Sequence, residues 1–421
     1  MASFAGLCED QMNMKPITYS CLLIYVCLTA MVGCATYSSQ KVGPTPIEHA
    51  KTEIPENQLM DVGILVFESQ ELTPEKAEKE GTNADIRKAE SHFVPYHLKN
   101  TLQQSGHWGA IQVVPAETNS VDLLVKGKII ESNGEILALE IEVVDTTAKR
   151  WFKKTYSAEA SEYIYSGNQA GSKDAYQDLY NAIANDMAKF KKKLTPTDIE
   201  AIRIVSKLKF AQEFAPDAFE GYLTKDKKDR LSVNRLPADN DPMMERLLQI
   251  REREYMYVDT LNHQYEKFYN EMWPSYENWR QLNLSERKAM KKIKREALTR
   301  QLIGALLVAG AIAAGSRNSG TARAIAPALA IVGGAVFING WNVSKEAEIH
   351  SAAIQELSES FGDEMQPVTM EFEGQQYELT GSAEEQFKSW KELLRQIYFA
   401  ETGFDPTPAP EEPDMDQNKK P

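Results

Sequence analysis

The sequence predicts an α+β protein, in which a small mixed-sheet α/β domain is followed by a mostly helical region that contains an apolar, Gly- and Ala-rich helical hairpin. Three observations support this fold class. Residues 59–190 alternate short apolar runs with helical patterns, residues 191–300 are strongly polar and mostly helical in pattern, and residues 301–342 are apolar and rich in small side chains. With 421 residues, of which 42% are hydrophobic, the chain is large enough for two or three domains.

Net charge and cysteine usage limit the classes of function. The formal net charge is -14, which repels phosphate backbones, so nucleic acid is not expected as a partner. All four cysteines lie in the first 34 residues, and Cys34 is the last of them. The body after it can form neither a disulfide nor a cysteine metal cluster, as expected of a chain that avoids thiols in an oxidising compartment.

Residues 1–33 have the pattern of an export signal. From Met14, a short basic stretch leads into an apolar run over residues 21–31 and then to a small residue, Gly33. This order of basic, apolar and small-residue regions is typical of a secretory signal. The residues before Met14 carry negative charge where such a signal needs positive charge. We therefore expect translation to start at Met14.

The sequence Met31-Val32-Gly33-Cys34 resembles the lipobox of bacterial lipoproteins. The resemblance implies that diacylglycerol is attached to the Cys34 sulfur, that the signal is cut before Cys34, and that the freed amine is acylated. Cysteine is the one residue here with a nucleophile strong enough for thioether formation. Ala35 stands where an aspartate would retain such proteins at the inner membrane. We therefore expect an outer-membrane lipoprotein that faces the periplasm.

The first folded region is expected after a tether. Residues 34–58 mix Ser, Gln, Pro, Glu and Lys without periodicity, which is typical of a linker. The α/β domain at 59–190 then begins with a strand at 61–67. A helix at 86–104 follows, and Gly106 marks its C-terminal end.

The rest of this domain is predicted to be four strands and a helix. After a strand at 108–114, the runs 121–130 and 135–144 flank an Asn-Gly pair, which is a strong hairpin signal because both turn positions need positive φ. A strand at 151–156 and a helix at 176–190 complete the order β-α-β-β-β-β-α. One face of the second hairpin strand is expected to be buried, through Leu137, Leu139, Ile141 and Val143.

This order of elements also carries a resemblance to a known family. Three phrases support it, namely Val62-Gly63-Ile64-Leu65, Ser105-Gly106-His107-Trp108 and Asp122-Leu123-Leu124-Val125-Lys126-Gly127. Over residues 60–190 the chain resembles the periplasmic α/β domain of curli-secretion-type and related transport-accessory lipoproteins. The pattern contains no second alternating hairpin of the length that a transmembrane pore needs, so the secretion-channel function is not carried over.

Aromatic residues recur within the helical region at 191–300. We interpret them as a helix stripe that fills a core, and the alternative is an aromatic groove for a carbohydrate or peptidoglycan strand. The spacing does not decide between the two interpretations. The residues are Tyr255, Tyr257, Tyr265, Phe268, Tyr269, Trp273, Tyr276 and Trp279.

The segment 301–342 resembles the glycine-zipper hairpins of envelope proteins. Its arms, residues 302–315 and 324–341, have 14 and 18 residues. At about 1.5 Å per residue, the first arm is shorter than the roughly 30 Å hydrocarbon core, and the second nearly spans it. Three interpretations stay open: membrane insertion, a buried hairpin in the body, or a self-association surface. The expected contact face consists of Gly304, Gly310, Ala311, Ala314, Gly315, Ala326, Ala330 and Gly334.

Basic and charged helices flank this segment. Seven cations between Arg287 and Arg300 predict a basic helix that meets lipid headgroups. In the region 343–401, we expect a helix at 343–361, a hairpin at 368–379 and an amphipathic helix at 383–398. The Pro- and acid-rich tail at 402–421 is expected to be disordered.

No catalytic pattern stands out. The sequence contains no Gly-x-Ser-x-Gly, His-Glu-x-x-His or P-loop motif. His92 and His97 are about 140° apart on a helix, which is a poor arrangement for a shared metal, and Glu140 and Glu142 share a face of one strand. We therefore expect no enzymatic activity, cofactor or metal. A carboxylate or histidine with a perturbed pKa in a concave pocket would favour an enzyme.

These observations together predict a lipid-anchored, non-catalytic accessory or scaffold protein of a cell-envelope assembly. Its expected partners are the membrane, through the lipid on Cys34, and envelope proteins, with a homo-oligomer as a further expectation. The alternative is an oligomeric channel or transport component that inserts into a membrane. A second alternative is a protein that binds or cleaves the cell wall.

Overall fold

The structure is a computed structural model that describes residues 40–69, 72–75, 77, 82–165, 173–313, 349–359, 365–372 and 375–403. The chain divides into two units, Met1–Ser39 and Gln40–Pro421, and all described residues belong to the second. The predicted signal segment and Cys34 therefore lie outside the described residues.

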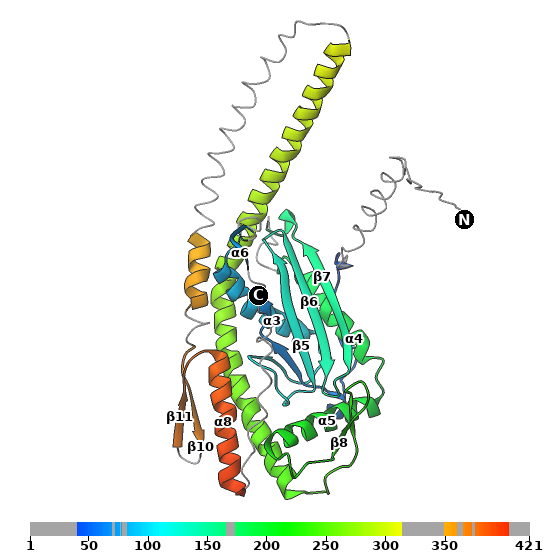
Figure 1. The fold of residues 1–421 in the computed structure, drawn as a ribbon, viewed down its shortest axis with the longest axis vertical. Helices are drawn as coiled ribbons and strands as arrows, with labels where there is room; N and C mark the ends of the chain where they lie inside the picture. Colours follow the sequence, from blue (N-terminus) through cyan, green and yellow to red (C-terminus); the bar gives the residue numbers. More distant parts are fainter. Residues whose placement is uncertain are drawn as a thin grey trace, which may run out of the picture. The chain divides into compact units, whose positions relative to one another are not determined.

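A mixed sheet of seven strands forms the centre of the α/β body (Figure 1). Its order is β1-β7-β6-β5-β2-β4, and β3 also pairs with β5. Strand β2 is parallel to both of its neighbours, whereas β5, β6 and β7 form an antiparallel meander. The predicted α+β class with a mixed sheet is confirmed. The strands are β1 (Gln40–Lys41), β2 (Val62–Leu65), β3 (Glu68–Ser69), β4 (Ile111–Val114), β5 (Leu123–Ser132), β6 (Ile136–Asp145) and β7 (Arg150–Glu159).

The β5–β6 hairpin forms where the Asn-Gly pair predicts it. Gly134 has a φ of 78°, which an L side chain rarely adopts. The Asn133 side-chain oxygen accepts hydrogen bonds from the backbone N–H groups of Glu135 at 3.0 Å and Ile136 at 2.8 Å. The predicted inward face of β6 is buried, with Leu137, Leu139, Ile141 and Val143 at 0–1% exposure.

Two helices pack on this sheet and on each other. Helix α3 (Ala84–Ser105) is capped by Asn83, whose side chain accepts from the Ile86 N–H at 2.7 Å, and it ends at Gly106 in the left-handed region. It contacts β2, β4 and β5, and α4 (Gln177–Lys191) contacts β7 and α3. The sequence prediction for both helices is confirmed.

The predicted tether at 34–58 is not a free linker from Gln40 onward. From Gln40 the chain lies on the α/β body, where β1 pairs in parallel with β7. Side chains of α4 also bind its backbone: Asp178 accepts from the Thr45 N–H at 3.2 Å, and Asn185 accepts from the Glu48 N–H at 2.8 Å. These partners are distant in sequence, so composition alone does not indicate them.

The region after the sheet is mostly helical, as predicted. Helix α5 (Pro196–Phe214) begins with a capping box between Thr195 and Asp198. A short hairpin of β8 (Leu223–Lys225) and β9 (Leu231–Val233), which the sequence analysis did not predict, leads to α6. Helix α6 (Pro242–Ala313) has 72 residues and is therefore about 108 Å long (Figure 1).

Helix α6 includes the beginning of the predicted apolar hairpin. Its backbone is helical to Ala313, so the first arm continues the basic helix without a break, and the remainder of 301–342 lies outside the described residues. Within the described part of the chain, no helix combines the length and the apolar character needed to cross a membrane.

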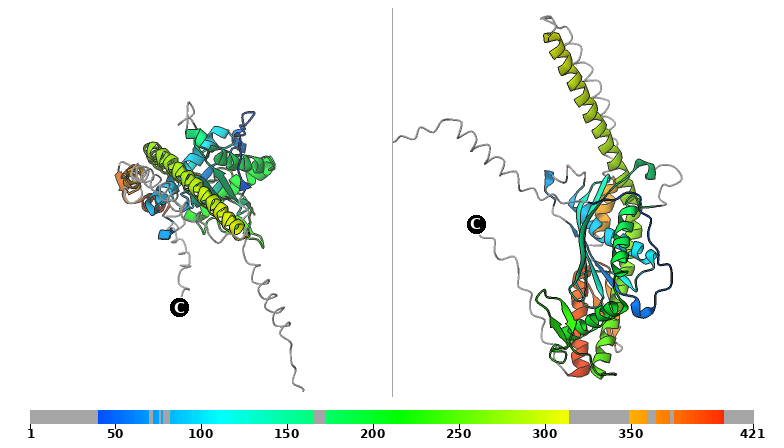
Figure 2. Two further views of the ribbon diagram at one scale, coloured as in Figure 1. Left: turned by 90° about the horizontal axis from the view of Figure 1, so that it is seen from above. Right: turned by 90° about the vertical axis from the view of Figure 1, so that its right-hand side faces the viewer.

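The C-terminal elements pack along the first half of α6. Residues 349–359 are helical, and β10 (Val368–Phe372) pairs with β11 (Gln375–Leu379) as predicted. Helix α8 (Ala383–Thr402) runs alongside α6 in Figure 1 and in the right-hand view of Figure 2. The tail after residue 403 lies outside the described residues.

Two hydrophobic cores share α6. The first joins the sheet, α3 and α4 to α6 residues from Phe268 to Leu284, and the second joins α5 and α8 to α6 residues from Leu247 to Tyr265. The interpretation of the aromatic stripe as core is confirmed for five residues with at most 3% exposure, namely Tyr257, Tyr265, Phe268, Tyr276 and Trp279.

Candidate functional site

The structure locates only part of the predicted contact face. Gly304, Gly310 and Ala311 lie on the helical backbone of α6. The other predicted residues lie outside the described part of the chain; they are the lipobox residues Met31, Val32, Gly33 and Cys34, and the small residues Ala314, Gly315, Ala326, Ala330 and Gly334.

The two histidines of α3 are packing residues in this structure. The His97 ring bonds to the Tyr269 hydroxyl at 2.7 Å and to the Gln177 side chain at 2.9 Å, and His92 stacks on Tyr265. Burial lowers the pKa of both histidines, so both rings are neutral near pH 7. Among the described residues, no cluster of three or more His, Cys, Asp or Glu side chains could hold a metal ion.

The end of α6 that precedes the apolar segment is exposed and basic. Leu284 is the last described residue of α6 that is buried. Residues 285–300 contain seven Lys and Arg residues and two Glu residues, which gives a local charge of +5. Met290 and Leu298 are 50% and 59% exposed on the same stretch. A basic helix with exposed apolar side chains is suited to an anionic lipid surface. Residues 285–300 are the basic segment of α6.

A buried ion pair holds α6 where this basic segment begins. The Arg280 guanidinium donates to the Asp174 carboxylate at 2.8 Å, and both side chains are at most 1% exposed. Burial alone would raise the pKa of Asp174, but the charge of Arg280 together with hydrogen bonds from the Tyr176 N–H and from Arg280 helps to hold this pKa below its usual value. The Arg280 guanidinium also lies 4.4 Å from the Tyr276 ring centroid.

A second buried carboxylate, Glu90, connects α3, α6 and the end of β5 close to this ion pair. Glu90 of α3 accepts from the Tyr276 hydroxyl of α6 at 2.6 Å and from Arg87 at 2.9 Å. It also accepts from the Ser132 hydroxyl at the end of β5, and Arg87 donates to the Ser132 carbonyl at 3.1 Å. These bonds fix the register of α6 against α3 and the hairpin because each has a directional partner.

The tip of the β5–β6 hairpin contacts α6 directly. A Cβ atom on Gly134 would lie 2.7 Å from the Arg280 carbonyl oxygen, so the turn approaches the helix more closely than a side chain allows. Glu135, whose side chain is 3% exposed, pairs with Lys291 at 2.6 Å and Arg287 at 3.7 Å. The Asn-Gly signal predicted the turn, but no local signal indicated that it docks on α6.

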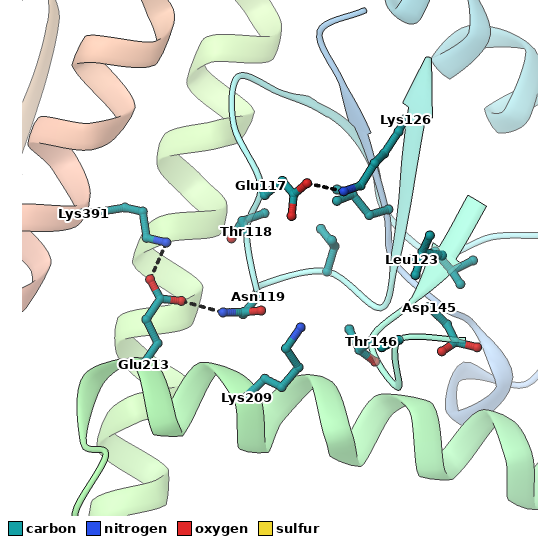
Figure 3. A pocket seen from close by; sticks show the side chains of 14 residues that line it. Glu117, Thr118, Asn119, Leu123, Lys126, Asp145, Thr146, Lys209, Glu213 and Lys391 are labelled. Carbon is teal, nitrogen blue, oxygen red and sulfur yellow. Dashed lines mark hydrogen bonds and ion pairs between the residues drawn. The ribbon is translucent and has the colours of Figure 1, made fainter. Parts of the chain in front are cut away.

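A cavity of about 480 Å³ lies beside the start of β5 (Figure 3). Two of the lysines that line it form ion pairs, Lys126 with Glu117 and Lys391 with Glu213. Lys209 of α5 points into the cavity between these two pairs. Burial lowers the pKa of Lys209, while three nearby carboxylates, Glu117, Glu213 and Asp145, oppose this shift. Three lysines and three carboxylates line this cavity, and two of these lysines are already in ion pairs.

A second cavity, of about 400 Å³, lies between α5 and α6 and contains a perturbed carboxylate. Burial raises the pKa of Asp122, which is the observation that the sequence analysis named as favouring an enzyme. The Asp122 carboxylate accepts from the Asp61 N–H at 3.0 Å and lies 4.0 Å from Arg251. Among the described residues that line this cavity there is no histidine or cysteine.

Comparison with known proteins adds little to this description. No family model matches the chain, and no curated protein matches it. A PelC dodecamer from Paraburkholderia phytofirmans is similar to part of the chain, with 12% sequence identity and a TM-score of 0.19. The match covers 35% of this chain and 94% of that chain. A likeness at this TM-score carries no argument about fold or function.

Proposed function

We propose that this protein is a non-catalytic, lipid-anchored accessory or scaffold protein of a bacterial cell envelope, and that α6 supplies a second contact with a membrane. The observation that carries the proposal is the continuity of α6. The helix is part of both hydrophobic cores as far as Leu284, becomes exposed and basic, and then continues as a helix into the apolar segment.

The proposed second contact follows from the order of residues along α6. Each cation near an anionic lipid surface contributes about 1 kcal/mol to binding. An apolar stretch that follows such cations in the same helix is positioned to enter the lipid while the cations stay at the headgroups. The polar contacts of Arg280 and Glu135 would connect this membrane contact to the sheet without a flexible joint.

Removal of the lipid tests the second contact. A full chain with Cys34→Ala, expressed in the envelope, is expected to stay with membranes after carbonate extraction, because the apolar segment of α6 holds it there. The extraction of a soluble periplasmic protein in the same preparation serves as the control. Complete release of the Cys34→Ala chain into the supernatant would exclude membrane insertion of the apolar segment.

Charge variants test the basic segment separately. In the Cys34→Ala background, Lys292→Gln with Arg295→Gln removes two exposed cations. Since each cation contributes about 1 kcal/mol, we expect the affinity for anionic vesicles to fall about 30-fold. The matched control is Lys227→Gln with Lys228→Gln, which removes two exposed lysines beside β8. Equal losses in flotation assays for the two pairs would mean that only net charge matters.

Crosslinking in cells tests the scaffold role. We expect crosslinks from the α/β body to other envelope proteins, identified by mass spectrometry. A product ladder that contains only this chain would contradict the scaffold proposal and would favour an oligomeric membrane component. Crosslinked peptidoglycan fragments would favour a cell-wall role instead.

A further inference from the structure

The cavity between α5 and α6 collects cations from both helices. Arg203 and Lys207 lie one turn apart on α5, and Arg251 and Tyr255 lie one turn apart on α6. Residues four positions apart share one face of a helix, so each helix presents a pair of side chains to the same space. The cavity of about 400 Å³ is large enough for a small organic molecule.

Arg251 lines this cavity with a guanidinium that hydrogen bonds hold in place. Its guanidinium donates to the Ser120 carbonyl from Nε at 3.1 Å and from Nη2 at 2.7 Å, and to the Ser206 hydroxyl at 2.9 Å. Its side chain is only 14% exposed. A guanidinium held in this way does not lose rotamer freedom when it binds a further partner, which favours binding.

The other two cations have spare donors. Arg203 donates from one nitrogen to the Glu56 carbonyl at 3.0 Å, and the Lys207 ammonium makes no hydrogen bond or ion pair with any residue that the structure describes. Burial lowers the pKa of Lys207, and the positive charges of Arg203 and Arg251 lower it further. The three cations are therefore close enough to repel one another in the free protein.

The carboxylates of the cavity offset this repulsion at Arg251 but not at Lys207. For Arg251 the attraction of Asp122 and Asp61 exceeds the repulsion by Arg203, whereas for Lys207 the repulsion by Arg203 and Arg251 exceeds the attraction of Asp122. Asp61 accepts from the Ala110 N–H at 2.8 Å, and Asp122 accepts from the Asp61 N–H at 3.0 Å, so both are directed partly toward the backbone. Arg251 comes no closer than 4.0 Å to Asp122, and the third carboxylate, Glu252, is exposed. An anion beside Lys207 would relieve its repulsion by Arg203 and Arg251.

We propose that this cavity binds a phosphomonoester, whose phosphate is held by Arg203, Lys207 and Arg251. Two guanidinium groups and an ammonium that converge from two helices match a tetrahedral dianion, whereas a planar carboxylate needs only one guanidinium. Leu248 and Tyr255 line the remaining space and give the organic part of the ligand an apolar and aromatic wall. This inference does not depend on the proposed membrane contact, because the cavity is formed by the body alone.

Titration calorimetry with glycerol 3-phosphate tests the site in the full Cys34→Ala chain at constant ionic strength. We expect saturable binding of one molecule per chain and no binding of glycerol. Lys207→Gln is expected to weaken binding about tenfold or more, since it removes a charge-assisted hydrogen bond. Arg203→Gln should weaken binding to a similar extent and provides a second test if the first variant does not fold.

Lys209→Gln is the matched control because Lys209 is on the same helix but faces the other cavity (Figure 3). It should leave the affinity for glycerol 3-phosphate unchanged, and thermal unfolding should show that all variants are folded. Dibutanoyl phosphatidic acid distinguishes the two sources of the phosphate. If it binds more tightly than glycerol 3-phosphate, the ligand is a lipid headgroup. If it binds more weakly, the ligand is a soluble phosphomonoester. Equal binding of glycerol and glycerol 3-phosphate, or equal losses in Lys207→Gln and Lys209→Gln, would overturn the proposal.

Discussion

Asp174→Asn is expected to destabilise the protein strongly, because it leaves a buried cation without its counter-charge. The Asp174 and Arg280 side chains are 0% and 1% exposed, so no water can replace the lost partner. Removal of one member of a buried ion pair typically costs about 3–5 kcal/mol. Since a domain has only about 5–15 kcal/mol of stability in total, the variant should unfold at a much lower urea concentration.

A double-mutant cycle separates this effect from general damage. Arg280→Met leaves the Asp174 carboxylate unpaired and should cost a similar amount, but Asp174→Asn combined with Arg280→Met removes both charges. We expect the double variant to be more stable than either single variant, with a coupling energy of about 3 kcal/mol.

Urea unfolding monitored by tryptophan fluorescence measures this coupling. Trp273 and Trp279 lie on the same part of α6 as Arg280, so the total tryptophan signal includes this region. A cost below about 1 kcal/mol for Asp174→Asn would show that the carboxylate does not compensate Arg280. Additive losses in the double variant would refute the assignment of this pair as the contact that holds α6.

Two further predictions concern other contacts of the body. Gly134→Ala should destabilise the protein by about 1–3 kcal/mol more than Gly221→Ala, because both have φ near +75°, at 78° and 74°, but only Gly134 approaches Arg280. Equal losses in urea unfolding would contradict docking of the hairpin on α6. Stability should also fall as the pH drops below about 6.5, since the lowered pKa values of His92 and His97 mean that the unfolded chain binds protons that the folded chain does not. The slope is at most about 1.4 kcal/mol per pH unit for each histidine, and His92→Phe should reduce it; an unchanged slope would refute this linkage.

Local signals predicted most of the secondary structure. The Asn-Gly turn and Gly106 each require a backbone conformation that few residues adopt, so they mark element ends reliably. Strands β1 and β3 have two residues each, and β8 and β9 have three, which is too short for an alternating pattern. The change from basic to apolar residues near position 300 suggested a boundary, but the backbone of α6 is continuous there.

The candidate sites depend on contacts between distant parts of the chain. Asp174 and Arg280 are 106 residues apart, and Glu135 and Lys291 are 156 residues apart. Neither pair has a spacing that a helix or strand would impose, so only the packing of α6 against the sheet brings them together. The same holds for the α5–α6 cavity, whose cations come from two helices with a hairpin between them.

The polar contacts of α6 lie along one side of the helix and therefore define its register. Tyr276, Arg280, Arg287 and Lys291 follow one another at spacings of four, seven and four residues, which keeps them on one face. Their partners are carboxylates on three different segments of the body, whereas an apolar face would tolerate a shift of the helix by one turn. Such a shift would displace the basic segment by about 5.4 Å. These ion pairs thus fix how far the proposed membrane contact extends from the body. The double variant Asp174→Asn with Arg280→Met, which lacks the buried pair, should have a less defined register of α6 against the body even where its stability is restored.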